Sequence, residues 1–259
     1  MRADEWAAEL AAWAIDPDIL AAAPESPYTL PPELFRAHHG HDSGPPSPLL
    51  DLARGALPAG GSVLDVGAGA GASSLPLVPP AARVVAVEDQ PSMLAEVVRL
   101  AADRGVDLTT HQGRWPDVAG EVETCDVVVC GHVFYNVPDL PAFAAALTAH
   151  ARHRVVAELH DTHPWVDLGP LWTHFHGQPR PAGPTADLAV AVLREAGISP
   201  SSREWERPAP DLAGPLGPAY ISFTRRRLCL PADREPEVAA LLLARPPAPR
   251  RTRVLWWDL

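Results

Sequence analysis

The chain has 259 residues and a formal net charge of −11, and 47% of its residues are hydrophobic and 20% charged. These proportions are typical of a globular protein and argue against a disordered chain. The excess of acids argues against a nucleic-acid partner, since a protein that binds a duplex needs cations to replace the counterions.

The residue types that are missing exclude further classes. The chain has no apolar run of about 18 residues, so we expect no membrane span. Its first residues include acids and form no apolar secretory segment. Every cationic side chain is an arginine, which excludes lysine-nucleophile and Schiff-base chemistry. Cys125, Cys130 and Cys229 have no metal-binding spacing, so we expect a reducing, cytoplasmic location.

Residues 1–57 are predicted to form helices broken by proline-rich turns. Trp6, Leu10 and Trp13 fall on one helical stripe. Two more short helices are expected, one beginning at Pro31 and one over Leu49–Leu57. The segment is too short for a core of its own. We therefore expect an N-terminal helical cap or lid over the remaining core, residues 58–259.

From residue 61 onward, strand and helix patterns alternate. Five strands are predicted first, over Ser62–Val66, Arg83–Val87, Val106–Thr110, Asp126–Cys130 and Arg154–Leu159. Helices are predicted over Pro91–Arg104, Asp139–Ala151 and Thr185–Ala196, with Gly105 and Gly197 as stop signals. Two last strands are expected near Ser202–Arg207 and Arg253–Asp258, with a helical insertion near 210–247 between them. This order predicts an α/β, doubly wound, mostly parallel sheet of about seven strands, the last antiparallel.

A glycine-rich loop follows the first of these strands. In Val63–Gly71 (VLDVGAGAG) an apolar strand ends and the loop opens toward an expected helix. Such glycines allow a tight turn and let a ligand approach the main chain. Glu88 ends the next strand, where a carboxylate can accept hydrogen bonds from both hydroxyls of a ribose. Together they predict a nucleoside-containing cofactor at the carboxyl edge of these two strands.

The loop does not have the G-x-G-x-x-G spacing of dinucleotide-binding proteins, and Asp65 suits a cationic, amino-acid-bearing ligand better than a pyrophosphate. Here the sequence resembles the class I (Rossmann-like) S-adenosylmethionine-dependent methyltransferases. The resemblance covers about residues 60–160 and rests on four segments, Val63–Gly71, Val84–Leu94, Gly113–Asp117 and Asp126–Val137. The Pro-Gly-Gly turn of many small-molecule members is replaced by Ala149–His153, so no subfamily is assigned.

The resemblance implies S-adenosyl-L-methionine as cofactor, with S-adenosyl-L-homocysteine as product. Asp65, Gly67, Ala68 and Gly69 would line the methionine portion, and Glu88 would bind the ribose. The resemblance places five residues at the adenine, namely Asp89, Met93, Arg114, Trp115 and Asp117, and it places Cys130 in the strand that faces the methionine. Core packing is the alternative for Met93 and Trp115, and a solvated strand end is the alternative for Glu88.

The candidate catalytic residues are His132, Tyr135 and His160, which follow or end the fourth and fifth strands. The carboxyl ends of parallel strands meet at one crevice, so these side chains are expected to face the transferred methyl group. Methyl transfer needs alignment and a deprotonated acceptor, and a neutral histidine is a suitable base near pH 7. The alternative is a structural histidine that holds a loop.

The remaining clusters of histidine and arginine residues allow more than one interpretation. A metal site could draw on His160, Asp161 and His163, but Mg²⁺ prefers several carboxylates and none is paired with Asp161, so no metal is predicted. Five further histidines (His38, His39, His41, His174 and His176) would line an acceptor pocket or lie scattered on the surface. Arg225–Arg227 is interpreted as a solvated helix face.

The sequence thus predicts a methyltransferase that acts on a small-molecule acceptor, with no nucleic-acid or membrane partner. A non-methylating catalyst or a regulator that binds S-adenosylmethionine would carry the same cofactor motifs and stays an alternative. A nicotinamide-dependent dehydrogenase is disfavoured by the glycine spacing and by Asp65. The acceptor, the atom that is methylated and the oligomeric state are left open.

Overall fold

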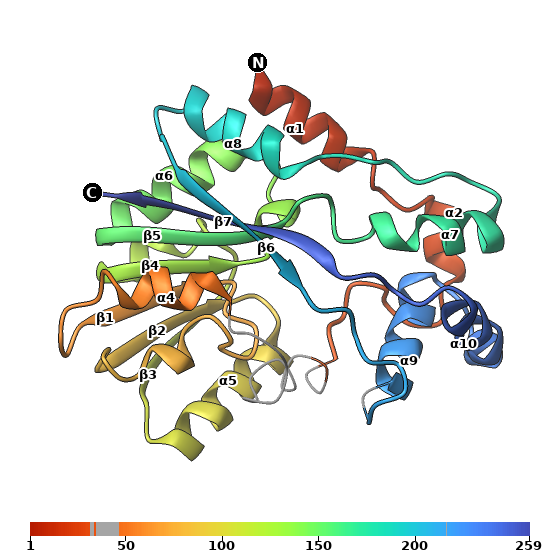
Figure 1. Cartoon of the computed structure of the whole chain (residues 1–259), viewed down its shortest axis with the longest axis horizontal. Helices are drawn as coiled ribbons and strands as arrows, with labels where there is room; N and C mark the ends of the chain where they lie inside the picture. The colour runs from red at the N-terminus through yellow and green to blue at the C-terminus, as the bar shows by residue number, and fades with distance from the viewer. Residues whose placement is uncertain (32–33, 35–46, 216) are drawn as a thin grey trace.

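The computed structural model describes residues 1–259 except 32–33, 35–46 and 216, and its centre is a seven-stranded sheet in the order β3-β2-β1-β4-β5-β7-β6 (Figure 1). The strands are β1 (Ser62–Val66), β2 (Arg83–Glu88), β3 (Asp107–Gln112), β4 (Cys125–Gly131), β5 (Ala151–His160), β6 (Ser201–Arg207) and β7 (Arg250–Asp258). Strands β1 to β5 are parallel, and β7 runs antiparallel to both β5 and β6. The predicted doubly wound, mostly parallel sheet with an antiparallel last strand is confirmed.

Three of the helices begin and end where the sequence signals them. In α5 (Pro91–Arg104) proline opens the helix and Gly105 closes it with a φ of 64°. The Asp139 side chain caps α6 (Leu140–His150), and the Thr185 side chain caps α8 (Ala186–Glu195). The remaining α-helices of the described chain are α1 (Arg2–Ala11), α2 (Pro17–Ala22), α4 (Pro48–Arg54), α7 (Gly169–His176), α9 (Gly217–Arg227) and α10 (Glu235–Ala244).

Helices cover both faces of the sheet because the inner strands are apolar on both sides. Leu64 and Val128 belong to the core beneath α6 and α8, whereas Val63 and Val127 pack toward α4 on the other face. Helices α2, α7, α9 and α10 contribute to a separate apolar cluster, and Figure 1 shows them gathered beyond the sheet at one side. The N-terminal helix α1 packs on α8, and its Trp6 is fully buried in the main core.

The helix expected after the glycine loop does not form. The chain makes turns and one short 3-10 segment, Leu75–Leu77, before it enters β2. Pro76, Pro79 and Pro80 lie in this stretch, and proline supplies no backbone N–H for a helical ladder. The predicted helix beginning at Pro31 falls largely on residues outside those that the structure describes, as do His38, His39 and His41.

The interpretation of Arg225–Arg227 as a solvated helix face is wrong. Arg225 is only 4% exposed, and the other two arginines are half-buried. The Arg225 guanidinium donates to Glu25 Oε1 at 2.6 Å and lies 3.4 Å from Glu235. The packing of α9 against α10 and the N-terminal segment covers this turn with acids that lie far away in the sequence.

Candidate cofactor and acceptor site

The glycine loop connects β1 to the cofactor side of the sheet, and its backbone requires glycine at two positions. Gly67 and Gly69 have φ angles of 70° and 53°, in the left-handed region. A Cβ on Gly67 would lie 2.4 Å from Val133 Cγ2, so the loop packs directly against the segment that follows β4. Gly67 and Ala68 both donate to the carbonyl of Val87, which fixes the loop to the end of β2.

Glu88 holds the loop from the neighbouring strand. Its carboxylate accepts hydrogen bonds from Gly69 N at 2.7 Å and Gln90 N at 3.0 Å, and its side chain is 7% exposed. Burial raises the pKa of Glu88, although the two backbone hydrogen bonds oppose that rise. The structure therefore places Glu88, the residue predicted to bind the ribose, beside the glycine loop.

Asp65 has a buried carboxylate oxygen that accepts no hydrogen bond from any described residue. The residue is 1% exposed; Ser74 Oγ donates to its Oδ2 at 2.6 Å, whereas Oδ1 is buried and has no partner in the described chain. Burial raises the pKa of Asp65 to about 7, and the nearby charge of Glu88 adds to the rise while Ser74 opposes it. An unpaired carboxylate oxygen beside a glycine loop fits the ammonium group of a bound amino-acid moiety.

The residues predicted at the adenine do not lie in one environment. Met93 is fully buried, and its Cε would be 3.4 Å from a Cβ on Gly69, so it packs behind the loop. Trp115 is 8% exposed, belongs to the main core and meets His150 edge to face at 4.7 Å. Three others, Asp89, Arg114 and Asp117, are exposed, and Arg114 Nε lies 3.9 Å from Asp89 Oδ2. Their cofactor roles stay predictions.

Cys130 lies within β4 and is fully buried. Burial raises its pKa well above the ordinary value, and the charge of Asp65 adds to the rise. The thiol is therefore neutral and acts as a small apolar group at the back of the cofactor side.

His132 follows β4 in an uncommon backbone conformation. Its φ is 61°, and its backbone N–H donates to the Glu158 carbonyl at 2.6 Å. Its Nε2 lies 2.8 Å from Glu158 Oε1 and 2.9 Å from Arg207 Nη1. One nitrogen cannot donate to the carboxylate and accept from the guanidinium at once.

We assign the Nε2 proton to the hydrogen bond with Glu158, and Arg207 then acts as a neighbouring positive charge. Glu158 is 5% exposed, and the Ser47 hydroxyl also donates to its carboxylate. Burial acts to raise the pKa of Glu158, but the hydrogen bond from His132, together with the Ser47 hydrogen bond and the charge of Arg207, holds the pKa below its ordinary value. With Nε2 protonated, His132 Nδ1 carries a lone pair, and this atom is buried with no partner among the described residues.

His160 and Tyr135 lie against the same place. The rings of His132 and His160 are 4.4 Å apart, and the Tyr135 hydroxyl donates to the His160 carbonyl at 2.7 Å. Burial lowers the pKa of His160 far below its ordinary value, and the charges of Arg250, Arg207 and Arg227 lower it further. Burial likewise raises the pKa of Tyr135 well above its ordinary value. Both side chains are therefore neutral near pH 7.

His163 joins this site to the N-terminal segment. Its ring stacks on Trp13 with centroids 4.0 Å apart, and burial lowers its pKa to about 3, with Arg227, Arg180 and Arg250 contributing. In the part of the chain that the structure describes, no group of three or more His, Cys, Asp or Glu residues is placed to hold a metal ion.

Sequence reasoning missed Glu158 and Arg207. Glu158 could have been found, because it is a lone charge in the apolar strand Val155–Leu159 and needs a partner there. Arg207 gives no such signal. It ends the edge strand β6, and only the order of β6 and β7 in the sheet brings it to His132.

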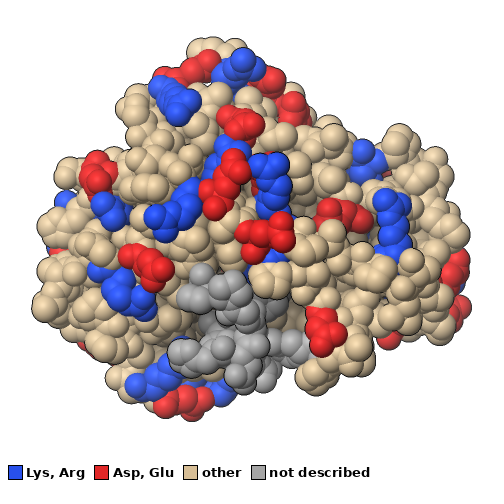
Figure 2. Space-filling model, viewed as in Figure 1, with Lys and Arg blue, Asp and Glu red and all other residues tan. Residues whose placement is uncertain are grey.

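Two observations bear on the excluded partners. None of the described helices is long and apolar enough to span a membrane. On the face shown in Figure 2, arginines alternate with aspartates and glutamates, and they do not form one basic patch.

Comparison with known proteins identifies the fold and a methyltransferase domain within it. Residues 63–154 match the family model described as a methyltransferase domain. The chain is similar to magnesium protoporphyrin IX methyltransferase from Synechocystis with bound SAH (17% identity, 87% of this chain and 92% of that chain, TM-score 0.53). It is also similar to coclaurine N-methyltransferase bound to N-methylheliamine and SAH (16% identity, 96% of this chain and 86% of that chain, TM-score 0.54). A putative methyltransferase from Bacillus halodurans is a third similar structure (15% identity, 84% of this chain and 97% of that chain, TM-score 0.55).

These identities are low, so the structural likenesses establish the fold alone, and the match to the methyltransferase domain applies to residues 63–154. No curated protein sequence matches the chain. The matched segment contains the glycine loop, Glu88 and the strand that leads to His132. Residues 63–154 therefore carry a methyltransferase domain on a class I methyltransferase-like fold, and S-adenosylmethionine-dependent methyl transfer is the activity that this domain supports.

Proposed function

We propose that the protein methylates a small molecule and that His132 acts as the base that takes a proton from the acceptor. The observation that carries this proposal is the state of the His132 ring. Its Nε2 is tied to the buried Glu158, and its Nδ1 is buried with no partner among the described residues. A histidine whose far nitrogen is held by a carboxylate has a fixed tautomer and orientation, as a general base needs.

Asp65, Gly67, Gly69 and Glu88 would hold the cofactor in this proposal. When bound, S-adenosylmethionine supplies a methyl group on a positively charged sulfur. The contact between Gly67 and Val133 supports a position of His132 close to the cofactor, because Val133 is the next residue in the chain. Glu158 keeps the proton on Nε2, and His132 Nδ1 receives the acceptor proton. Tyr135 and Thr252 are positioning residues, since their hydroxyl groups contact the His160 backbone and ring.

We further propose that residues 1–57 form a cap over the acceptor. Three contacts support this assignment. Trp6 Nε1 donates to the Val137 carbonyl at 2.8 Å, Trp13 stacks on His163, and Leu30 N donates to Gln90 Oε1 at 3.2 Å. The segment thus touches the chain after β4, after β5 and at the start of α5. A cover at these positions would exclude water from the transfer.

The small-molecule class of the acceptor is supported by charge. The chain has a net charge of −11, and its arginines are largely engaged by acids. The test is a methyl-transfer assay with isotopically labelled S-adenosylmethionine against pools of small metabolites, RNA and protein. Label in the small-molecule fraction is expected. Label in RNA or protein alone would contradict the proposed acceptor class.

A further inference from the structure

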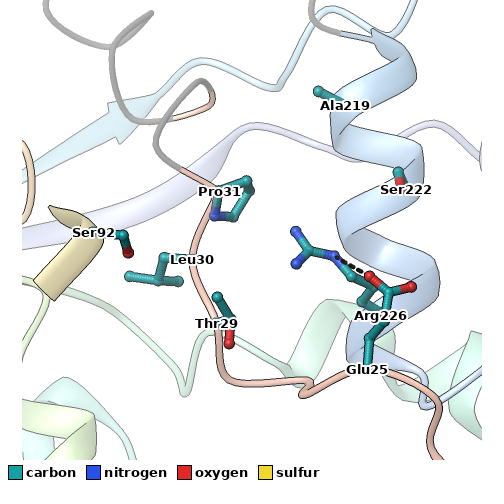
Figure 3. Close-up of a pocket in the computed structure, with 8 residues that line it drawn as sticks. All are labelled: Glu25, Thr29, Leu30, Pro31, Ser92, Ala219, Ser222 and Arg226. Atoms are coloured by element: carbon teal, nitrogen blue, oxygen red, sulfur yellow. Dashed lines mark ion pairs between the residues drawn. The ribbon is translucent and has the colours of Figure 1, made fainter. Parts of the chain in front are cut away.

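The three consecutive arginines of α9 have different surroundings. Arg225 is paired with Glu25 and Glu235. Arg226 faces a pocket of about 410 Å³ between α9, residues 29–31 and the start of α5, where Figure 3 shows it beside Glu25. Arg227 has no ion pair or hydrogen bond in the described chain, and its Nε is buried without a partner. Its charge is met only by aromatic faces.

The aromatic side chains of Phe223 and Trp165 contact Arg227. The Arg227 guanidinium carbon lies 4.2 Å from the ring centroid of Phe223 and 5.3 Å from that of Trp165. Trp165 N donates to His163 Nδ1 at 3.2 Å, which places Trp165 next to the histidines at the end of β5. Arg227, Trp165 and His160 each keep part of their surface accessible to solvent.

Two more arginines, Arg207 and Arg250, are cross-strand neighbours on β6 and β7 beside the end of β5. Arg207 contacts His132, and Arg250 donates to the Pro164 carbonyl at 2.7 Å. Arg207, Arg227 and Arg250 all lie near enough to His160 to lower its pKa further after burial. Burial also lowers the pKa of Arg227 to about 9, and the charge of Arg250 contributes.

The carboxylates among the described residues do not balance this cluster. Glu158 offsets the charge of Arg207, and Asp167 accepts from Arg250 at 2.5 Å. Arg227 has no such partner, although the chain as a whole is strongly acidic. A cation held inside a protein without a counter-charge is costly, and a bound anion would offset that cost.

We propose that Arg227, supported by Arg207 and Arg250, binds an oxyanion group of the acceptor, and that the acceptor is a small aromatic molecule carrying a carboxylate or phosphate. A guanidinium presents a planar fork that matches such groups. Phe223 and Trp165 would contact the apolar part of the same molecule. This inference rests on the proposed function, because it names the substrate class of the same site.

Calorimetry on protein saturated with S-adenosylhomocysteine tests the inference with three probes, benzoate, phenyl phosphate and neutral benzamide. Benzoate or phenyl phosphate is expected to bind at millimolar concentrations or below, and benzamide at least tenfold more weakly. The anion that binds more tightly identifies the group. Equal binding of benzamide, or no binding of either anion, would overturn the proposal.

Variants assign the effect to Arg227. Arg227→Gln should weaken anion binding at least tenfold, and Arg227→Lys should restore part of it because the charge returns. Arg203→Gln is the matched control, since Arg203 lies exposed on β6. The melting temperature of free Arg227→Gln should be no lower than that of the wild type, because an uncompensated cation is removed. Unchanged anion binding in Arg227→Gln would contradict the inference.

The design separates this inference from the proposed function. If S-adenosylhomocysteine itself does not bind, the proposed function fails first. If it binds and neither anion does, the methyltransferase assignment stands and only the anionic acceptor is refuted.

Discussion

At position 132 a histidine occupies a backbone conformation that most side chains avoid. A φ of 61° costs a non-glycine residue roughly 1–2 kcal/mol, and such strain concentrates at functional sites. Its side chain is held by Glu158, and Nδ1 has no partner among the residues that the structure describes. Strain, an oriented ring and a free lone pair occur together in one residue, which a purely structural histidine does not require.

We therefore expect His132→Ala to lower turnover by about 10²- to 10⁴-fold, the usual contribution of a positioned base. His132→Asn should lose activity as well, because asparagine tolerates the left-handed backbone but takes no proton near neutral pH. Affinity for S-adenosylhomocysteine, measured by calorimetry, should stay within a few-fold in both. Full turnover in His132→Asn would show that the residue orients the acceptor and is not a base.

Glu88 gives a prediction on the cofactor side. Glu88→Ala removes a buried carboxylate that holds the glycine loop and is the proposed ribose ligand. Loss of such a charged hydrogen-bonding group costs roughly 1.5–3 kcal/mol, or about 10- to 150-fold in affinity for S-adenosylhomocysteine. Asp107→Ala, at an exposed position where β3 begins, is the comparison. Equal affinity of wild type and Glu88→Ala would refute the role of Glu88.

The raised pKa of Asp65 predicts how the free energy of unfolding of the free protein depends on pH. Its pKa is raised from 3.8 to about 7 by burial, so the folded state keeps a proton that the unfolded state releases. This contribution to stability is fully present below pH 3.8 and is lost as the pH rises toward 7, with a slope on the order of 1.4 kcal/mol per pH unit. Asp65→Asn should unfold in urea with a weaker fall in stability between pH 5 and 7. The same fall in both proteins would contradict this account.

At the scale of elements, the N-terminal helix α1 is part of the main core. Trp6 is fully buried, stacks on Tyr135 at 5.5 Å and donates to the Val137 carbonyl. Its partners belong to the segment after β4 that also carries His132. The proposed cap and the acceptor side are therefore coupled through the Trp6–Tyr135 contact, in addition to the stacking of Trp13 on His163.

Trp6→Ala should lower the free energy of unfolding by about 3–5 kcal/mol, because a large buried side chain leaves a cavity. Trp13→Ala, whose ring stacks on His163, should cost less stability but should lower turnover on the true acceptor. Urea unfolding and steady-state kinetics separate the two effects. If a chain beginning near residue 58 kept full turnover, the proposed cap would be wrong.

Across the whole molecule, the fold was largely predictable, because the pattern of buried strands and helix caps is local in the sequence. Asp139, Thr185 and Gly105 mark helix ends within a residue or two, as their caps require. The predicted helix after the glycine loop is wrong, because Pro76, Pro79 and Pro80 supply no backbone N–H for a helical ladder. The surroundings of Arg227 and the Arg207–His132 contact were not predictable, since they depend on elements distant in the sequence.

The most direct test of the account is a pair of calorimetric titrations of the whole protein, one with S-adenosylhomocysteine and one with NAD. Asp65, the glycine loop and Glu88 are each assigned to the first ligand and not to a dinucleotide. We predict saturable binding of S-adenosylhomocysteine, weakened by Glu88→Ala, and no binding of NAD in the same range. Tight binding of NAD with no binding of S-adenosylhomocysteine would contradict the account.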